Sequence, residues 1–180
     1  MTMQDRFLAA ASFRAFIDAA KENRELWTAQ ARLARVSPDA VARVRRLGRT
    51  VHLLVLNEDW CGDAVNTVPF VARLAEEAGI DLRSLGRDAN PDLMDAHLTG
   101  TARSIPVVMI LDENFEELGW WGPRPTQLQE WVLTEGLKLP AEERYREIRR
   151  WYARDKGVTT VNEIVALLER VAGTREEAAA

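Results

Sequence analysis

The first quarter of the chain repeats apolar residues at helical spacing. Apolar positions recur at intervals of three and four from residue 3 to residue 47, as in Phe13 and Ile17, and this spacing places them on one face of an α-helix. No proline interrupts the stretch before Pro38, where Ser37 can cap a new helix. The pattern therefore predicts helix throughout residues 3–47.

The pattern then changes to short apolar runs that alternate with helical stretches. The run at residues 51–56 is apolar and rich in β-branched and branched side chains, as expected for a buried strand. A polar turn follows, and the next helical pattern contains Pro69, which predicts a kink. The predicted elements are strands at residues 51–56, 80–85, 105–111 and 115–121, and helices at residues 64–78, 91–98, 126–137, 141–154 and 160–171.

This order of elements predicts an α/β fold with a four-stranded mixed sheet flanked by helices. The first strand–helix–strand unit should be parallel and right-handed, while the last two strands should form an antiparallel hairpin. We interpret residues 1–48 as an N-terminal helical extension, 49–139 as the core and 140–180 as a C-terminal helical extension, all within one compact domain. The order places Cys61 between the end of a strand and the start of a helix, where reaction sites of open α/β sheets lie.

Composition narrows the possible partners and the location. The chain has 180 residues, is 47% hydrophobic and carries a formal net charge of −4, with no basic block of the kind that binds nucleic acid. No stretch approaches the ~18 consecutive apolar residues of a membrane span. The first 16 residues include charged side chains and do not resemble a secretion signal. We therefore expect a cytoplasmic protein without a nucleic-acid or membrane partner.

The chain contains one cysteine and two histidines. A single cysteine excludes an internal disulfide and a multi-cysteine zinc site. Neither His52 nor His97 lies in a ligand-like cluster, so we expect no metal site and no bound cofactor. Cys61 is then either a small buried residue or a reactive thiol.

Motifs around this cysteine resemble those of the thioredoxin superfamily. Trp60, Cys61 and Gly62 precede a proline-kinked helix, as in the Trp-Cys-x-x-Cys motif of that superfamily. Ile105 and Pro106 open a strand 45 positions after the cysteine, where the family has a cis proline that faces the reactive sulfur. Residues 58–63 and 87–91 look most like a bacterial thioredoxin-like subfamily, and the resemblance covers residues 50–138.

The chain departs from this motif at Ala64, which occupies the position of the family's second, resolving cysteine and makes the variant Cys-x-x-Ala. Val55 occupies the position where many thioredoxins bury an acid that accepts a proton from that second thiol. The resemblance therefore implies a nucleophile, Cys61, that can attack a disulfide but cannot close an internal one.

We expect the Cys61 thiol to be moderately activated. Amide groups at a helix N-terminus favour the thiolate and can lower a cysteine pKa well below ~8.5. Gly62 should leave the sulfur accessible, whereas the negative charge of Asp63 should oppose ionisation. The alternative is an inert, partly buried cysteine.

The resemblance also implies a groove for an extended substrate. The backbone of Ile105 next to a cis Pro106 should pair with substrate, and Trp60 should form one lip, with Gly62 and Asp63 also in contact. Arg87 and Arg103 lie in loops that could approach the sulfur and hold an anion, such as the carboxylate of a thiol cofactor. Residues 121–124 follow a strand and either border the site or serve only as core and turn.

Three functions remain open for this arrangement. The leading one is a monothiol thiol–disulfide oxidoreductase, in which Cys61 forms mixed disulfides with protein or small-molecule thiols and an external low-molecular-weight thiol resolves them. The second is a redox-inactive binding module, and the third is a cysteine redox sensor. A further possibility is that Ala64 is an engineered substitution that traps mixed disulfides.

Overall fold

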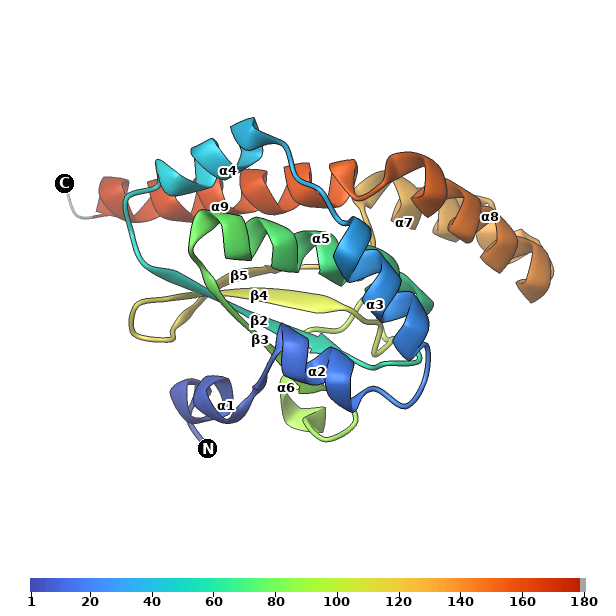
Figure 1. The fold of residues 1–180 in the computed structure, drawn as a ribbon, viewed down its shortest axis with the longest axis horizontal. Helices are drawn as coiled ribbons and strands as arrows, with labels where there is room; N and C mark the ends of the chain where they lie inside the picture. The colour runs from blue at the N-terminus through green and yellow to red at the C-terminus, as the bar shows by residue number, and fades with distance from the viewer. Residues whose placement is uncertain (179–180) are drawn as a thin grey trace.

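A mixed β-sheet of five strands runs through residues 1–178, the part of the chain that the computed structural model describes (Figure 1). The strand order is β1-β3-β2-β4-β5, with β2 parallel to β3 and antiparallel to β4, and with β4 antiparallel to β5. The predicted α/β class and mixed sheet are confirmed, but a fifth, two-residue strand joins the four expected ones. The strands are β1 (Ala11–Ser12), β2 (Val51–Asn57), β3 (Asp81–Gly86), β4 (Val107–Asp112) and β5 (Glu117–Trp121).

Helices cover both faces of the sheet. α5 and α9 lie on one side, with α4 packed outside them, and α1 and α6 lie on the other (Figure 1). The helices are α1 (Met3–Ala9), α2 (Phe13–Ala19), α3 (Arg24–Leu33), α4 (Pro38–Arg45), α5 (Gly62–Ala78), α6 (Pro91–Asp95), α7 (Thr126–Thr134), the short 3-10 helix η1 (Gly136–Lys138), α8 (Ala141–Asp155) and α9 (Val158–Ala178).

The N-terminal region is not continuously helical, so that prediction is wrong. β1 interrupts it and pairs antiparallel with β3. Ser12 then caps α2 by accepting a hydrogen bond from the amide of Ala15, and Asn23 adopts a left-handed conformation just before α3. The outer edge of β3 has backbone groups that can pair with another strand. The alanine-rich segment that contains β1 pairs with this edge, although its apolar residues have helical spacing.

The sheet is built around β2, whose middle residues are buried on both faces. Leu53, Leu54, Val55 and Leu56 are each 0% exposed. A strand with helices on both sides is expected to be apolar throughout instead of alternating. The continuous apolar run therefore follows from the central position of β2, and it places the end of this strand, where Cys61 follows, inside the helical layers.

The last helix begins earlier than predicted and is not started by the expected capping box. α9 begins at Val158, and Glu163 does not cap its N-terminus. Instead, the carboxylate of Glu163 accepts hydrogen bonds from the indole of Trp121, at 2.7 Å, and from the amide of Thr126, at 2.8 Å. Glu163 thus ties α9 to both ends of the loop between β5 and α7.

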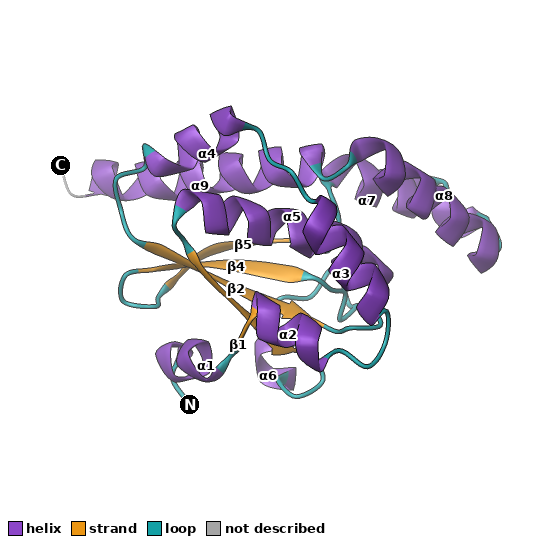
Figure 2. Cartoon of the chain, viewed as in Figure 1, coloured by secondary structure: helices purple, strands orange, loops and turns teal. Residues whose placement is uncertain are grey.

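α7 and α8 form a helical pair that extends away from the sheet at the end of the molecule opposite the C-terminus (Figure 2). A small apolar cluster of Leu128, Val132, Ile148 and Tyr152 packs between them, separate from the main core. The main core draws on buried residues from Phe7 to Val171. The pair therefore has its own packing and meets the rest of the molecule through polar contacts described below.

His97 forms a buried charged pair with β5, and we expect it to make stability depend on pH. Its ring is 3% exposed; Nε2 lies 2.9 Å from the Glu117 carboxylate and Nδ1 lies 2.7 Å from the Leu93 carbonyl. Two acceptors are satisfied only by the protonated ring. The hydrogen bond that His97 donates to the Glu117 carboxylate accordingly raises the pKa of His97, against the opposing effect of burial.

A group whose folded pKa is raised stabilises the fold below its unfolded pKa, about 6.5, and loses that effect as pH rises through the folded pKa. Glu117→Gln should therefore lower the free energy of unfolding by about 1 kcal/mol more at about pH 6 than at about pH 9. Urea denaturation at both pH values measures this, with the exposed Glu130→Gln as control. Equal losses at the two pH values would contradict the prediction.

Candidate active site

Cys61 lies where β2 leads into α5, as predicted, and serves as the N-cap of that helix. Its Sγ accepts a hydrogen bond from the amide of Ala64 at 3.4 Å, and its thiol donates to the carbonyl of Ile105, also at 3.4 Å. The Ile105–Pro106 peptide bond is cis. The structure therefore brings together Cys61, Ile105 and Pro106, which lie far apart in the sequence, and the expected cis proline is confirmed.

The expected activation of the thiol is not observed. Cys61 is 7% exposed, and burial raises its pKa to about 11. The amide of Ala64 lowers this pKa and the charge of Asp63 raises it, but both effects are smaller than that of burial. The expected pKa below ~8.5 is therefore wrong, because the sequence placed the sulfur at a helix N-terminus but did not show how deeply that terminus is covered.

Asp63 is not an exposed carboxylate beside the sulfur but one member of a buried ion pair. Its side chain is 12% exposed and that of Arg124 is 16% exposed. The guanidinium of Arg124 donates to both Asp63 oxygens, at 2.9 and 2.6 Å, and the Tyr152 hydroxyl donates to one of them at 2.8 Å. Asp63 is thus directed toward the β5–α7 loop and α8.

The loop that carries Arg124 packs directly on the cis proline. Gly122 has a φ of +137°, and a Cβ atom at this position would lie 2.1 Å from the Pro106 carbonyl oxygen. The Gly122–Pro123 peptide bond is also cis. Residues 121–124 therefore border the site, which decides between the two interpretations that the sequence left open.

Tyr152 was not found by sequence reasoning. It lies four residues after Ile148 on α8, and both side chains are 4% exposed. Apolar spacing of this kind predicts a core position, which Tyr152 does occupy. Nothing in the sequence indicates that its hydroxyl meets Asp63, 89 positions earlier.

Trp60 lies at the rim of the site and is 42% exposed. The guanidinium of Arg87 stacks over its ring at 4.9 Å and also donates to Asp88 and to the carbonyl of Arg103. Arg103 pairs with Asp95 through two hydrogen bonds of 2.6 and 2.7 Å. The charged side chain that lowers the pKa of Cys61 is Arg124.

Ala64, which the resemblance places at the position of the resolving cysteine, is buried. Ala64 and Val55 are each 0% exposed, and their hydrocarbon side chains offer no polar or sulfur group. Gly62 has no heavy atom within 4 Å of an added Cβ, and open space therefore adjoins the backbone on that side.

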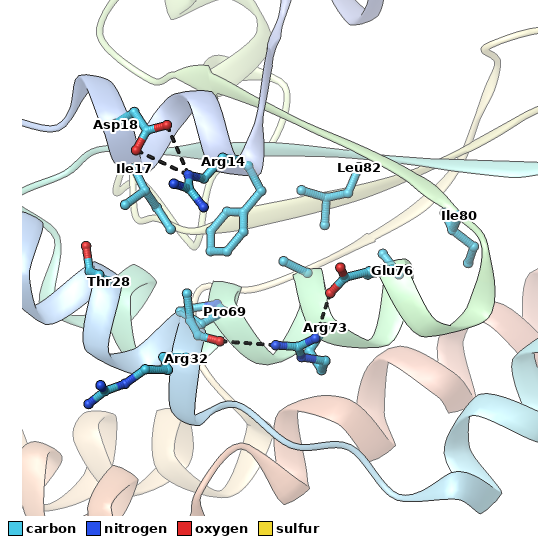
Figure 3. A pocket seen from close by; sticks show the side chains of 14 residues that line it. Arg14, Ile17, Asp18, Thr28, Arg32, Pro69, Arg73, Glu76, Ile80 and Leu82 are labelled. Atoms are coloured by element: carbon cyan, nitrogen blue, oxygen red, sulfur yellow. Dashed lines mark hydrogen bonds and ion pairs between the residues drawn. The ribbon is translucent and has the colours of Figure 1, made fainter.

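A pocket of about 510 Å³ lies elsewhere, between α2, α3, α5 and β3 (Figure 3). Ion pairs of Arg14 with Asp18 and of Arg73 with Glu76 lie at its edges. It contains none of the site residues that the sequence predicted.

The described residues hold no group of three or more His, Cys, Asp or Glu side chains placed to bind a metal ion. Within residues 1–178, no helix has the length and apolar character needed to cross a membrane.

Comparison with known proteins decides the family. A family model described as thioredoxin matches residues 10–144. The chain belongs to the thioredoxin family. The match begins within the N-terminal helices, before the stretch 50–138 that the motifs indicated, so most of these helices belong to the thioredoxin match.

Two solved structures share this thioredoxin fold. One is a protein of unknown function from Pseudomonas aeruginosa, with 19% identity over 94% of this chain and 98% of that chain and a TM-score of 0.74. The other is an HIV epitope scaffold, with 20% identity over the same shares of the two chains and a TM-score of 0.73. No curated protein matches the chain. At these identities the two structures establish the fold alone.

Proposed function

We propose that this thioredoxin-family protein exchanges disulfides at Cys61 as a monothiol. The observation that carries the proposal is the meeting of two backbone groups at one sulfur: the amide of Ala64 and the carbonyl that precedes the cis Pro106 both lie 3.4 Å from Sγ. An amide at a helix N-terminus supports negative charge on the sulfur during attack. The proposed partners are protein or small-molecule disulfides and an external thiol.

The exchange needs no bound cofactor. The Cys61 thiol loses its proton to solvent, and the thiolate attacks one sulfur of a partner disulfide. A new S–S bond forms to Sγ while the partner's S–S bond breaks, and the second partner sulfur leaves as a thiolate that takes up a proton. An external thiolate then attacks the mixed disulfide, releasing Cys61 and carrying away the partner as a new disulfide.

Burial limits the rate of the first step. With a pKa of about 11, about one Cys61 side chain in ten thousand is a thiolate at pH 7. The rate should therefore rise about tenfold per pH unit until the pH approaches that pKa. We propose a slow exchange at neutral pH, unlike that of a low-pKa thioredoxin thiol.

The same burial supports a second candidate, a redox-inactive binding module. Cys61 is 7% exposed and protonated at neutral pH, as expected of a cysteine that only fills space. A redox sensor receives less support, because sensor cysteines are accessible and have a low pKa. The two leading candidates differ in whether folded Cys61 forms a mixed disulfide at all.

We expect folded protein incubated with an excess of oxidised glutathione to gain one glutathione at Cys61. Intact-mass spectrometry between about pH 7 and pH 10 should show an adduct whose rate rises steadily through this range, because a thiol with a raised pKa ionises late. The protein unfolded in guanidinium chloride, with an ordinary thiol pKa near ~8.5, should react faster at neutral pH and level off earlier.

Cys61→Ser is the matched control and should form no adduct. If the folded protein forms no adduct at any pH at which circular dichroism shows it intact, while the unfolded protein reacts, the binding module becomes the better description. Addition of a reducing thiol should release the adduct and restore the original mass.

A further inference from the structure

The loop between β5 and α7 holds a partly buried cation, Arg124, against the first turn of α5, which Cys61 caps. Gly122 lies against the Pro106 carbonyl, and the Ile105 carbonyl, one residue earlier, accepts the hydrogen bond from Cys61. Arg124 follows Gly122 by two positions. The loop therefore begins on the cis-proline side of the sulfur and turns its guanidinium toward the first turn of α5.

The guanidinium of Arg124 is held by three hydrogen bonds to two side chains. It donates two hydrogen bonds to Asp63 and a third, at 2.9 Å, to the side chain of Gln129. Asp63 lies two residues after Cys61, so the ion pair and the sulfur share one turn of helix. A paired arginine and aspartate with side chains 16% and 12% exposed are screened less by solvent than an exposed pair, so their charges can act on a nearby group.

The C-terminal helices complete this arrangement. Tyr152 of α8 is 4% exposed and donates its hydroxyl to Asp63. Burial raises the pKa of this hydroxyl, so it remains a hydrogen-bond donor. α8 packs on α7 through the small apolar cluster that includes Tyr152, and the hydroxyl of the same residue links this cluster to Asp63.

We propose that Arg124 is a positioning residue that favours negative charge on Cys61, and that Asp63 and Tyr152 hold its guanidinium in place. This role of Arg124 would serve the disulfide exchange proposed above, and it rests on that proposed function. The charged and titratable groups that act on the sulfur come from three elements: Asp63 from α5, Arg124 from the loop and Tyr152 from α8. Because Asp63 disfavours the thiolate and Arg124 favours it, removing either charge should have opposite effects.

Alkylation of the full-length protein by iodoacetamide tests this, since the rate follows the thiolate population. At about pH 9, Arg124→Gln should react about three- to tenfold more slowly than the original protein, and Asp63→Asn should react faster by a similar factor. The carbon-13 shift of the Cys61 Cβ should move its titration in the same two directions. Arg103→Gln breaks a similar but exposed pair with Asp95 and should change neither measurement.

Opposite shifts separate a charge effect from a structural one, because simple loosening of the ion pair would move both variants in the same direction. Arg124→Lys keeps the positive charge and should react at most of the rate of the original protein. If Arg124→Gln fails to fold, Arg124→Lys and Asp63→Asn are compared instead. Shifts in one direction, or no shift, would overturn the inference even if the glutathione adduct forms. Opposite shifts without any adduct would support the role of Arg124 and reject monothiol exchange.

Discussion

Replacing Gly122 with alanine is expected to destabilise the protein by about 3 kcal/mol or more. The added Cβ would lie 2.1 Å from the Pro106 carbonyl oxygen, which is backbone and cannot rotate away, and a φ of +137° is available almost only to glycine. The β5–α7 loop would have to leave the cis proline. Urea or guanidinium denaturation at equilibrium measures the loss.

Gly62→Ala is the matched control for this prediction. Gly62 has open space around an added Cβ and no positive φ, and it begins α5, where alanine is tolerated. Its free energy of unfolding should change by less than about 0.5 kcal/mol. Similar losses for the two variants would mean that the loop does not depend on close contact with Pro106.

Replacing Ala64 with cysteine is expected to turn a protein without disulfide-reductase turnover into one that has it. The original protein contains one thiol, so it cannot close an internal disulfide and should be inactive in an insulin-reduction assay coupled to a thioredoxin reductase. In the variant, the new thiol would stand at the residue whose amide already contacts Cys61 Sγ at 3.4 Å. It could attack a mixed disulfide and release the reduced product.

Two measurements check the Ala64→Cys prediction. Oxidised protein should lose two hydrogens in mass through an internal disulfide, and insulin reduction should rise from background to a measurable rate. Ala64→Ser, similar in size to cysteine but without a thiol, should do neither. Turnover in the original protein would contradict the account of Cys61, and a variant that stays reduced under oxidising conditions would show that the two side chains cannot meet.

The fold class was predictable because its signals are local or follow simple topological rules. The apolar run of β2, the helix that contains Pro69 and the strand that begins after Ile105–Pro106 each predicted an element that the structure contains. Parallel pairing of β2 with β3 followed from the intervening helix. The short strand β1 did not follow, because two residues that pair with a sheet edge carry no periodic pattern of their own.

The candidate site also has some properties that depend on local sequence and others that depend on contacts between distant elements. The sequence by itself determined that the protein has one thiol, that this thiol stands at the N-terminus of α5 and that no second cysteine can resolve its adducts. These properties depend on residue identity and on neighbours in the chain. They made Cys61 identifiable from the sequence, and the resemblance to the thioredoxin superfamily added Ile105 and Pro106.

Only the tertiary structure decided how the thiol behaves. The pKa of Cys61 depends on how much of the molecule covers it, and the direction of Asp63 depends on Arg124 and Tyr152, which lie 61 and 89 positions away in the chain. Burial and charge pairing arise from contacts between elements that share no sequence neighbourhood. For that reason the sequence located the reacting atom, whereas its protonation state at neutral pH came from its burial in the folded protein.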